Sequence, residues 1–273
     1  MQATTPLIAR DESTGTVPVR VGALEVGGKR LAVMAGPCSV ESEEQILATA
    51  RAVKAAGATF LRGGAFKPRT SPYSFQGLRE DGLRLLALAK AETGLLIVTE
   101  VMDARHLDLV AEHADVLQIG SRNMHNYTLL DELGRAKRPI LLKRGMSATL
   151  EEFMMSAERV AAAGNDRIML CERGIRTFET ATRNTMDLNA VPWLKFNTRL
   201  PVLVDPSHGT GLWWMVPYLS KAAVAVGADG LLVEVHYQPD KAFSDGYQSL
   251  TPQTFEKMMA EVRAVAAAVG REA

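Results

Sequence analysis

The sequence predicts a (β/α)8 barrel of the TIM type, and three observations lead to this prediction. Eight short apolar segments alternate with helical patterns along the chain. Apolar strands that alternate with helices form a parallel sheet that is buried on both faces. Polar residues collect just after most of these strands, as they do at the C-terminal face of a barrel. An open doubly wound sheet is the alternative, but the sequence lacks the Gly-x-Gly-x-x-Gly turn that favours its dinucleotide-binding form.

The region before the barrel is expected to form a tail and a hairpin. Residues 1–16 are polar and rich in threonine, which predicts a disordered or extended N-terminal tail. Apolar segments at 17–26 and 29–33 flank Gly27-Gly28, and this pattern predicts a β-hairpin that leads into the first barrel strand. We expect residues 17–273 to form a single catalytic barrel domain.

The barrel elements follow in regular order. Strands are predicted at 31–35, 59–62, 95–99, 116–119, 140–143, 168–171, 202–204 and 231–235. Helices are predicted at 43–56, 76–92, 104–113, 127–136, 150–163, 184–195, 213–227 and 253–269. Capping-box spacing at Ser42-x-x-Gln45 and Thr149-x-x-Glu152, and Pro252 at a first helical position, indicate where three of these helices begin.

The composition excludes several classes of function. The chain has 273 residues, and its 31 Lys+Arg balance 31 Asp+Glu, so nothing indicates a nucleic acid or an anionic membrane as partner. No apolar run approaches the roughly 18 residues of a membrane span, and residues 1–16 lack the core of a signal peptide. Two cysteines, Cys38 and Cys171, make no disulfide framework, so a reducing cytoplasm is the expected location.

One segment, 62–76, gathers cations and hydroxyl groups directly after the second predicted strand. Glycines and prolines keep this segment out of a helix and let a ligand approach the backbone closely. Its candidate anion-binding side chains are Arg62, Lys67, Arg69, Thr70 and Ser71. A solvated basic loop is the alternative interpretation.

Cations also follow three other predicted strands, at Arg122, Lys143 and Arg173. In a chain of zero net charge, a local excess of positive charge needs substrate charge to balance it. The six cations together therefore predict a cleft for two anionic groups, of which at least one is a phosphate. For each cation taken singly, a structural salt bridge is an equally good interpretation.

Glu234 interrupts the apolar run of the last predicted strand. A buried carboxylate without a partner costs several kcal/mol, so Glu234 needs a cation or a metal ion. Cys38, His208 and Asp245 lie on turns that could reach the same end of the barrel, and the four make a mixed S/N/O set that suits Mn, Fe, Co or Zn. A buried apolar cysteine and ordinary turn residues are the alternatives, because no short ligand spacing joins the four.

Six ordered motifs make the chain similar to a known family. They are Gly36-Pro-Cys-Ser39, Arg62-Gly-Gly-Ala-Phe-Lys-Pro-Arg-Thr-Ser71, Ile119-Gly-Ser-Arg-Asn-Met124, Leu142-Lys-Arg-Gly145, Cys171-Glu-Arg-Gly174 and Asp205-Pro-Ser-His-Gly209. Together they resemble 3-deoxy-D-arabino-heptulosonate 7-phosphate (DAHP) synthase, in the microbial group related to 3-deoxy-D-manno-octulosonate 8-phosphate (KDO8P) synthase. The resemblance implies a transferase that condenses phosphoenolpyruvate (PEP) with erythrose 4-phosphate, the first step of the shikimate pathway of aromatic amino acid biosynthesis.

The resemblance also implies roles for individual residues. Cys38, His208, Glu234 and Asp245 match the ligands of one divalent metal ion, with Mn²⁺ expected first and Fe²⁺, Co²⁺, Zn²⁺ or Cd²⁺ as alternatives. The residues that match the PEP site are Arg62, Lys67, Gly120, Ser121, Arg122, Lys143 and Arg173. Those that match the erythrose 4-phosphate site are Lys67, Pro68, Arg69, Thr70, Ser71 and Asp205. Lys67, Lys143, His208 and Cys38 are the catalytic candidates, and Glu100 is a further candidate for proton transfer.

Three alternative functions stay open from the sequence. KDO8P synthase typically shows Lys-Ala-Asn-Arg where this chain has Lys67-Pro-Arg-Thr70, which favours the four-carbon acceptor. A metal-free aldolase that uses Lys143 as a Schiff-base nucleophile and a non-catalytic phosphosugar-binding barrel are the other two. The resemblance further implies a homo-oligomer, a dimer or tetramer, and allows a separate chorismate mutase as partner. About sixteen residues before Val17 are too few for a sensor domain, so we expect no inhibition by phenylalanine or tyrosine.

Overall fold

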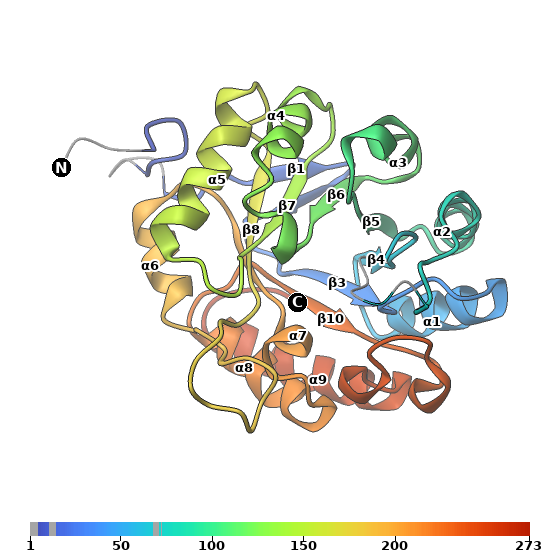
Figure 1. Ribbon diagram of the computed structural model, residues 1–273. Helices are drawn as coiled ribbons and strands as arrows, with labels where there is room; N and C mark the ends of the chain where they lie inside the picture. The colour runs from blue at the N-terminus through green and yellow to red at the C-terminus, as the bar shows by residue number, and fades with distance from the viewer. Residues whose placement is uncertain (1–4, 11–14, 68–70, 72) are drawn as a thin grey trace.

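The computed structural model describes residues 5–10, 15–67, 71 and 73–273. Its eight parallel strands close into a barrel in the order β10-β3-β4-β5-β6-β7-β8-β9, with helices around the outside (Figure 1). A two-stranded antiparallel sheet precedes the barrel. The predicted fold class, a (β/α)8 barrel with an N-terminal hairpin, is therefore confirmed.

Each barrel strand lies within one residue of its predicted bounds. The strands are β3 (Ala32–Gly36), β4 (Phe60–Arg62), β5 (Leu96–Glu100), β6 (Val116–Ile119), β7 (Ile140–Lys143), β8 (Ile168–Glu172), β9 (Val202–Val204) and β10 (Gly230–Glu234). The prediction succeeds because these strands are mostly apolar and buried. The parallel register of β10 and β3 pairs Glu234 with Gly36, so polar residues from distant parts of the chain meet at one end of the barrel.

The helices confirm the alternating pattern, although two of them begin well after their predicted starts and one short helix was not predicted. They are α1 (Glu43–Ala55), α2 (Glu80–Thr93), α3 (Leu107–His113), α4 (Tyr127–Arg135), α5 (Leu150–Ala162), α6 (Ala190–Asn197), α7 (Pro206–Thr210), α8 (Val216–Ala225) and α9 (Pro252–Ala268). Short 3₁₀ turns cover η1 (Ala104–His106), η2 (Ser121–Asn123), η3 (Trp213–Met215), η4 (Pro239–Lys241) and η5 (Gly246–Gln248).

The differences have local causes. Helix α2 begins four residues later than predicted because Arg79, with φ 56, cannot continue a right-handed helix. Helix α6 begins six residues late because Thr185 pairs with Ile175 across a bridge instead of entering the helix. Helix α7 was not predicted; Asp205 caps it by accepting a hydrogen bond from the His208 N–H, and Pro206 occupies its first turn.

The hairpin exists, but its predicted turn is wrong. Strands β1 (Val19–Val21) and β2 (Leu24–Val26) are joined at Gly22-Ala23 and not at Gly27-Gly28. Gly22 has φ 58, a left-handed conformation that glycine adopts without a steric penalty.

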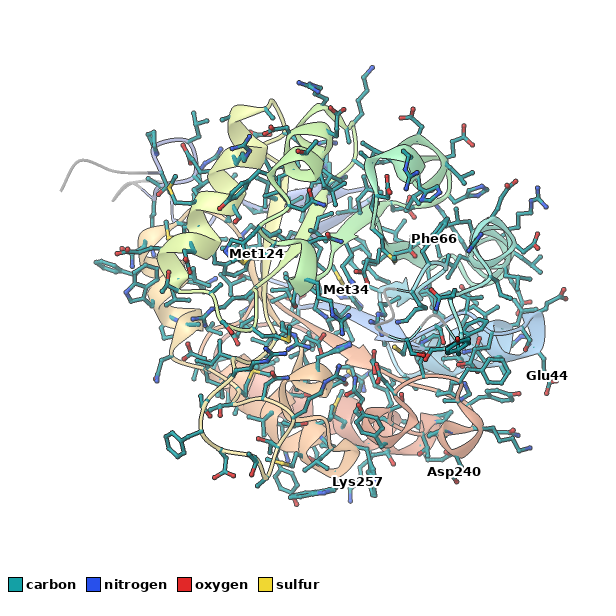
Figure 2. All side chains as sticks on the ribbon, in the orientation of Figure 1. Met34, Glu44, Phe66, Met124, Asp240 and Lys257 are labelled. Carbon is teal, nitrogen blue, oxygen red and sulfur yellow. The ribbon has the colours of Figure 1, made fainter. Side chains whose placement is uncertain are left out.

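The hairpin lies over the N-terminal end of the barrel. Its valines pack in one cluster with side chains from the barrel interior, among them Met34, Phe60 and Met169. Figure 2 shows Met34 inside the ring of strands, whereas Glu44 and Lys257 point outward from their helices. A second, larger cluster lies between the strands and the surrounding helices. Because the hairpin closes one end, the C-terminal end is left for a site.

Part of the expected tail is packed against the barrel. Ile8 is fully buried, and the backbone N–H groups of Leu7 and Ile8 donate to the carboxylate of Glu158 on α5. Ala9 pairs with Thr198 after α6. The described segment 5–10 thus forms a turn that is attached to the domain. None of the helices formed by the described residues is long and apolar enough to cross a membrane.

The packing of α9 on the barrel predicts a difference in stability between two phenylalanines. Phe255 on α9 is fully buried, so Phe255→Ala should lower the free energy of unfolding by about 3–5 kcal/mol. Phe196 on α6 is 77% exposed, so Phe196→Ala should change it by less than about 0.5 kcal/mol. Urea unfolding of both variants beside the unmodified protein measures this, and equal losses would contradict the packing described.

Candidate active site

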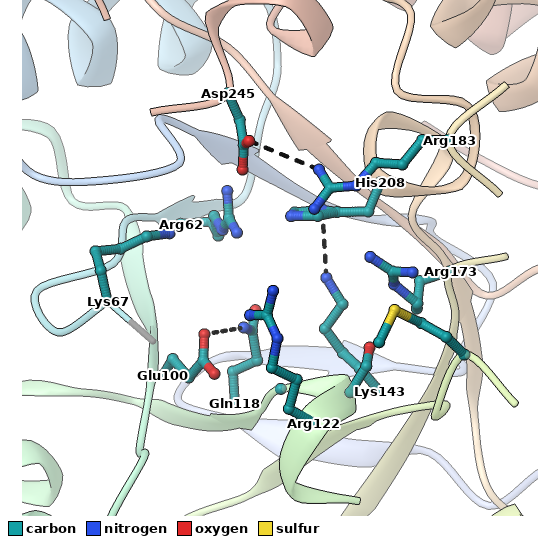
Figure 3. Close-up of a pocket in the computed structure, with 13 residues that line it drawn as sticks. Arg62, Lys67, Glu100, Gln118, Arg122, Lys143, Arg173, Arg183, His208 and Asp245 are labelled. Atoms are coloured by element: carbon teal, nitrogen blue, oxygen red, sulfur yellow. Dashed lines mark hydrogen bonds and ion pairs between the residues drawn. The ribbon is translucent and has the colours of Figure 1, made fainter. Parts of the chain in front are cut away.

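A cavity opens at the C-terminal ends of the barrel strands (Figure 3). Its lining residues are Arg62, Lys67, Glu100, Gln118, Gly120, Ser121, Arg122, Lys143, Met146, Arg173, Arg183, His208 and Asp245. All seven residues expected to bind PEP are among them. A Cβ at Gly120 would lie 2.1 Å from Oε1 of Glu100, so a larger residue there would force the Glu100 side chain to move.

The four expected metal ligands meet beside this cavity. The potential ligand atoms of Cys38, His208, Glu234 and Asp245 all lie within 4.8 Å of one another. Cys38 follows β3, Glu234 ends β10, His208 lies on α7 and Asp245 precedes η5. One thiol, one imidazole and two carboxylates form a donor set that fits a borderline divalent metal ion.

His208 is held with one ring nitrogen turned toward this cluster. Its Nδ1 lies 2.7 Å from Oδ2 of Asp205 and donates to it, because an ionised carboxylate can only accept. The other nitrogen, Nε2, lies 3.4 Å from Oε1 of Glu234. The neutral ring therefore presents the lone pair of Nε2 to a metal ion, with Asp205 fixing the tautomer.

Asp205 lies beneath the cavity and not on its surface. Its side chain is fully buried, accepts from His208 and forms an ion pair with Lys143. These partners hold the pKa of Asp205 well below its usual range: burial opposes ionisation, but the charges of His208 and Lys143 outweigh it. This placement favours a role in orienting His208 and Lys143 over the expected direct contact with erythrose 4-phosphate.

Burial and neighbouring charges together set the pKa values in the metal-ligand cluster. Burial lowers the pKa of His208 to about 4, so the imidazole is neutral at pH 7. It also raises the pKa of the Cys38 thiol to about 11, with the charge of Glu234 adding to the effect. Burial would raise the pKa of Glu234 as well, but the charges of His208 and Arg62 outweigh it and set the pKa at about 2. A bound dication would reverse the balance at Cys38 and favour its thiolate.

The cations of the cavity differ in their partners. Arg62 forms a buried ion pair with Glu234, and Lys67 donates to Sγ of Cys38 at 2.9 Å. Arg173 is only 4% exposed, yet its Nε and Nη1 have no hydrogen-bond partner among the described residues. Burial lowers the pKa of Arg173. A buried guanidinium with unsatisfied donors at a cavity wall is a binding site for an anion such as phosphate or carboxylate.

The residues expected to bind erythrose 4-phosphate are described only in part. Pro68, Arg69 and Thr70 lie outside the described residues. Ser71 is exposed, and its Oγ accepts from the backbone of Tyr73. Among the polar residues at the strand ends, Glu172 pairs with Arg144 in a buried contact of 2.9 Å, which is structural.

Arg183 lines the cavity but the sequence did not indicate it. It lies in the segment between β8 and α6, which the periodicity assigned in part to a helix. Its Nη1 lies 3.6 Å from Oδ1 of Asp245. No strand ends near Arg183 in the sequence, so the rule that placed the other cations could not find it.

Comparisons with known proteins agree with this geometry. The family model of the DAHP synthetase I family matches residues 13–268. The phospho-2-dehydro-3-deoxyheptonate aldolase of Thermotoga maritima is 49% identical over 264 residues, which are 97% of this chain and 78% of that protein. The 2-dehydro-3-deoxyphosphooctonate aldolase of Syntrophotalea carbinolica is 34% identical over 92% of this chain and 96% of its own.

Two solved structures have the same fold. The crystal structure of the Thermotoga maritima DAHP synthase superposes with a TM-score of 0.94 at 48% identity, over 97% of this chain and 78% of that one. A truncated form of the Thermotoga maritima 3-deoxy-D-arabino-heptulosonate 7-phosphate synthase gives a TM-score of 0.91 at 44% identity, over 98% of each chain.

The low pKa of His208 predicts a pH dependence of stability. The unfolded chain takes up a proton near pH 6.5, whereas folded His208 does so only near pH 4. The unfolded state therefore binds more protons in this window, and the metal-free protein should lose stability, by at most about 3 kcal/mol from His208, as the pH falls through it. Urea unfolding in excess chelator between pH 7 and pH 4 measures this. His208→Asn should flatten the decline, and an unchanged slope would contradict the assignment.

Proposed function

The chain belongs to the DAHP synthetase I family, and on that premise we propose that it condenses PEP with erythrose 4-phosphate and water to give DAHP and inorganic phosphate. The observation that carries the proposal is the metal-ligand cluster of four side chains directly beside a cavity with an unsatisfied buried arginine. In such a site, a metal ion acting as a Lewis acid would lie next to the cavity that binds an anionic substrate.

The cations would hold PEP in its reacting position. Arg173 offers two unpartnered donors to a phosphate or carboxylate, and Arg62, Arg122 and Lys143 line the same cavity (Figure 3). The backbone N–H of Ser121 lies at the same wall of the site. Fixing both anionic groups of PEP removes much of the entropic barrier to the condensation.

The reaction then forms one carbon–carbon bond and breaks one carbon–oxygen bond. When bound, a divalent metal ion polarises the aldehyde oxygen of erythrose 4-phosphate as a Lewis acid. C3 of PEP attacks the aldehyde carbon, water adds at C2, and the hemiketal phosphate collapses with loss of phosphate. Lys143, Lys67 and Glu100 lie close enough to the cavity to transfer protons in these steps. Mn²⁺ is the ion we propose, with Fe²⁺, Co²⁺, Zn²⁺ and Cd²⁺ as alternatives.

The chain's partners beyond its substrates are a further proposal. We propose a homo-oligomer, a dimer or tetramer, because Trp213, Trp214 and Tyr218 are 50–65% exposed beside and on α8, and exposed aromatic side chains in a group are typical of contact surfaces. A cytoplasmic location and a separate chorismate mutase as partner rest on the resemblance alone.

Acceptor choice separates the proposed function from that of KDO8P synthase. The relatives named for the octonate reaction are 29–34% identical, against 49% for the heptonate relative. We expect kcat/KM with erythrose 4-phosphate to exceed that with arabinose 5-phosphate by about tenfold or more, which corresponds to about 1.4 kcal/mol in the transition state. An assay of PEP consumption with each sugar measures this, and a preference for the five-carbon sugar would overturn the proposal.

Metal removal separates the proposed enzyme from a Schiff-base aldolase. Excess chelator should abolish activity and Mn²⁺ should restore it, because a bound metal ion would be the Lewis acid that activates the aldehyde. Cys38→Ser should weaken Mn²⁺ binding by at least about tenfold. Cys171→Ser is the matched control, since the Cys171 thiol lies inside the barrel and outside the cluster. Full activity in chelator, or borohydride trapping of substrate on Lys143, would contradict the metal role.

A further inference from the structure

Gln248 contacts Glu234, one of the expected metal ligands, at the carboxylate oxygen that does not face His208. Its side chain is fully buried, and its Nε2 donates to Oε2 of Glu234 at 2.6 Å. Its amide oxygen accepts from Nη1 of Arg183 at 2.8 Å. A carboxylate only accepts and a guanidinium only donates, so one orientation of the amide satisfies both neighbours and the opposite one satisfies neither. Gln248 is therefore locked between Glu234 and Arg183.

Arg183 contacts the second carboxylate. Its Nη1 lies 3.6 Å from Oδ1 of Asp245, and the hydroxyl of Tyr247 donates to the same oxygen at 3.2 Å. Asp245 has φ 54, a left-handed conformation that costs a non-glycine residue of order 1 kcal/mol. The backbone of Asp245 is thus strained, and Arg183 and Tyr247 hold Oδ1 of its side chain.

The backbone around Arg183 is attached to the helix that carries the histidine ligand. The N–H of Arg183 donates to the carbonyl of Thr210 at 2.9 Å, and the Asn184 side chain donates to the carbonyl of His208 at 2.9 Å. Arg183 is therefore joined to three ligand-bearing segments: α7, the end of β10 through Gln248, and the loop before η5. Figure 3 shows its side chain reaching across toward Asp245.

These contacts leave one oxygen of each carboxylate facing the cluster. Oε1 of Glu234 lies 3.4 Å from Nε2 of His208 and also pairs with Arg62, and Oδ2 of Asp245 lies 3.1 Å from Sγ of Cys38. The other two oxygens are engaged from outside by Gln248, Tyr247 and Arg183. Carboxylates whose second oxygen is already hydrogen-bonded bind a metal ion through the remaining one.

We propose that Arg183 and Gln248 are positioning residues that orient Glu234 and Asp245 as single-oxygen metal ligands. The inference rests on the metal-dependent function proposed above. Gln248 supplies a neutral link between Arg183 and Glu234, whereas Arg183 pairs directly with Asp245 at 3.6 Å, so Arg183 supports both carboxylates. Neither positioning residue needs to touch the metal ion.

Metal affinity without substrate tests this proposal. Mn²⁺ binding is titrated by the EPR signal of the free ion in Gln248→Leu, Arg183→Met and the double variant. Each single variant should bind Mn²⁺ at least about tenfold more weakly, the usual range for residues that support metal ligands. Gln248 and Arg183 act through one contact, so their effects on Mn²⁺ binding should not add. The double variant should bind Mn²⁺ much more tightly than the summed losses in binding free energy of the two single variants predict. Arg183→Lys keeps the charge, so its Mn²⁺ affinity should lie between those of the unmodified protein and Arg183→Met.

Controls separate positioning from general destabilisation. Gln238→Leu and Arg176→Met change exposed residues of the same two loops and should bind Mn²⁺ as the unmodified protein does. The visible spectrum of the Co²⁺-loaded Gln248→Leu protein should change, while its KM for PEP at saturating Mn²⁺ should not, because Gln248 does not line the cavity. If Gln248→Leu fails to fold, Arg183→Lys and Arg183→Met carry the test.

Two results would overturn the inference. One is unmodified Mn²⁺ affinity in both single variants, and the other is strictly additive losses in the double variant. Failure of the proposed function looks different, because it would show as full activity of the unmodified protein in chelator. A metal-dependent protein whose variants bind Mn²⁺ normally would refute only the positioning role.

Discussion

The buried carboxylate of Glu234 is the constraint on which the site depends. It ends a central barrel strand at 1% exposure, where an unpaired charge would cost several kcal/mol. Arg62, His208 and Gln248 surround it, and each comes from a different part of the chain. The barrel makes this convergence possible because parallel strands deliver all of their C-terminal ends to one face. A metal ion at this point would complete the neutralisation that the protein side chains begin.

The cavity next to the metal-ligand cluster has an excess of positive charge, in contrast to the buried negative charge of Glu234. Its cations outnumber its carboxylates, and Arg173, which is nearly buried, keeps two donors without partners among the described residues. A bound anion would satisfy those donors. The two halves of the site thus require two kinds of ligand, a dication and an anion, and a metal-dependent condensation of PEP uses both.

The barrel, the four-residue cluster and most residues of the cavity could be predicted from the sequence, for a physical reason. Strand ends in a parallel barrel point to one face whatever the loops do, so Cys38, Lys143 and Glu234 could be placed from the strands alone. Details set by tertiary contacts were missed. The hairpin turned at Gly22, and Arg183 reached the site through a segment held against α7 rather than along a strand. Asp205 was singled out, but its burial beneath the cavity was not foreseen, because its capping of a short helix depends on local backbone geometry.

The central claim is that one divalent ion bound by Cys38, His208, Glu234 and Asp245 lies beside bound PEP. Anomalous diffraction at the manganese edge, from crystals soaked in Mn²⁺ and PEP, tests it most directly. We expect one strong manganese peak at coordination distance from all four side chains, with PEP bound to Arg173 in the adjoining cavity. A manganese peak elsewhere in an active crystal form, or PEP bound away from the cluster, would contradict it.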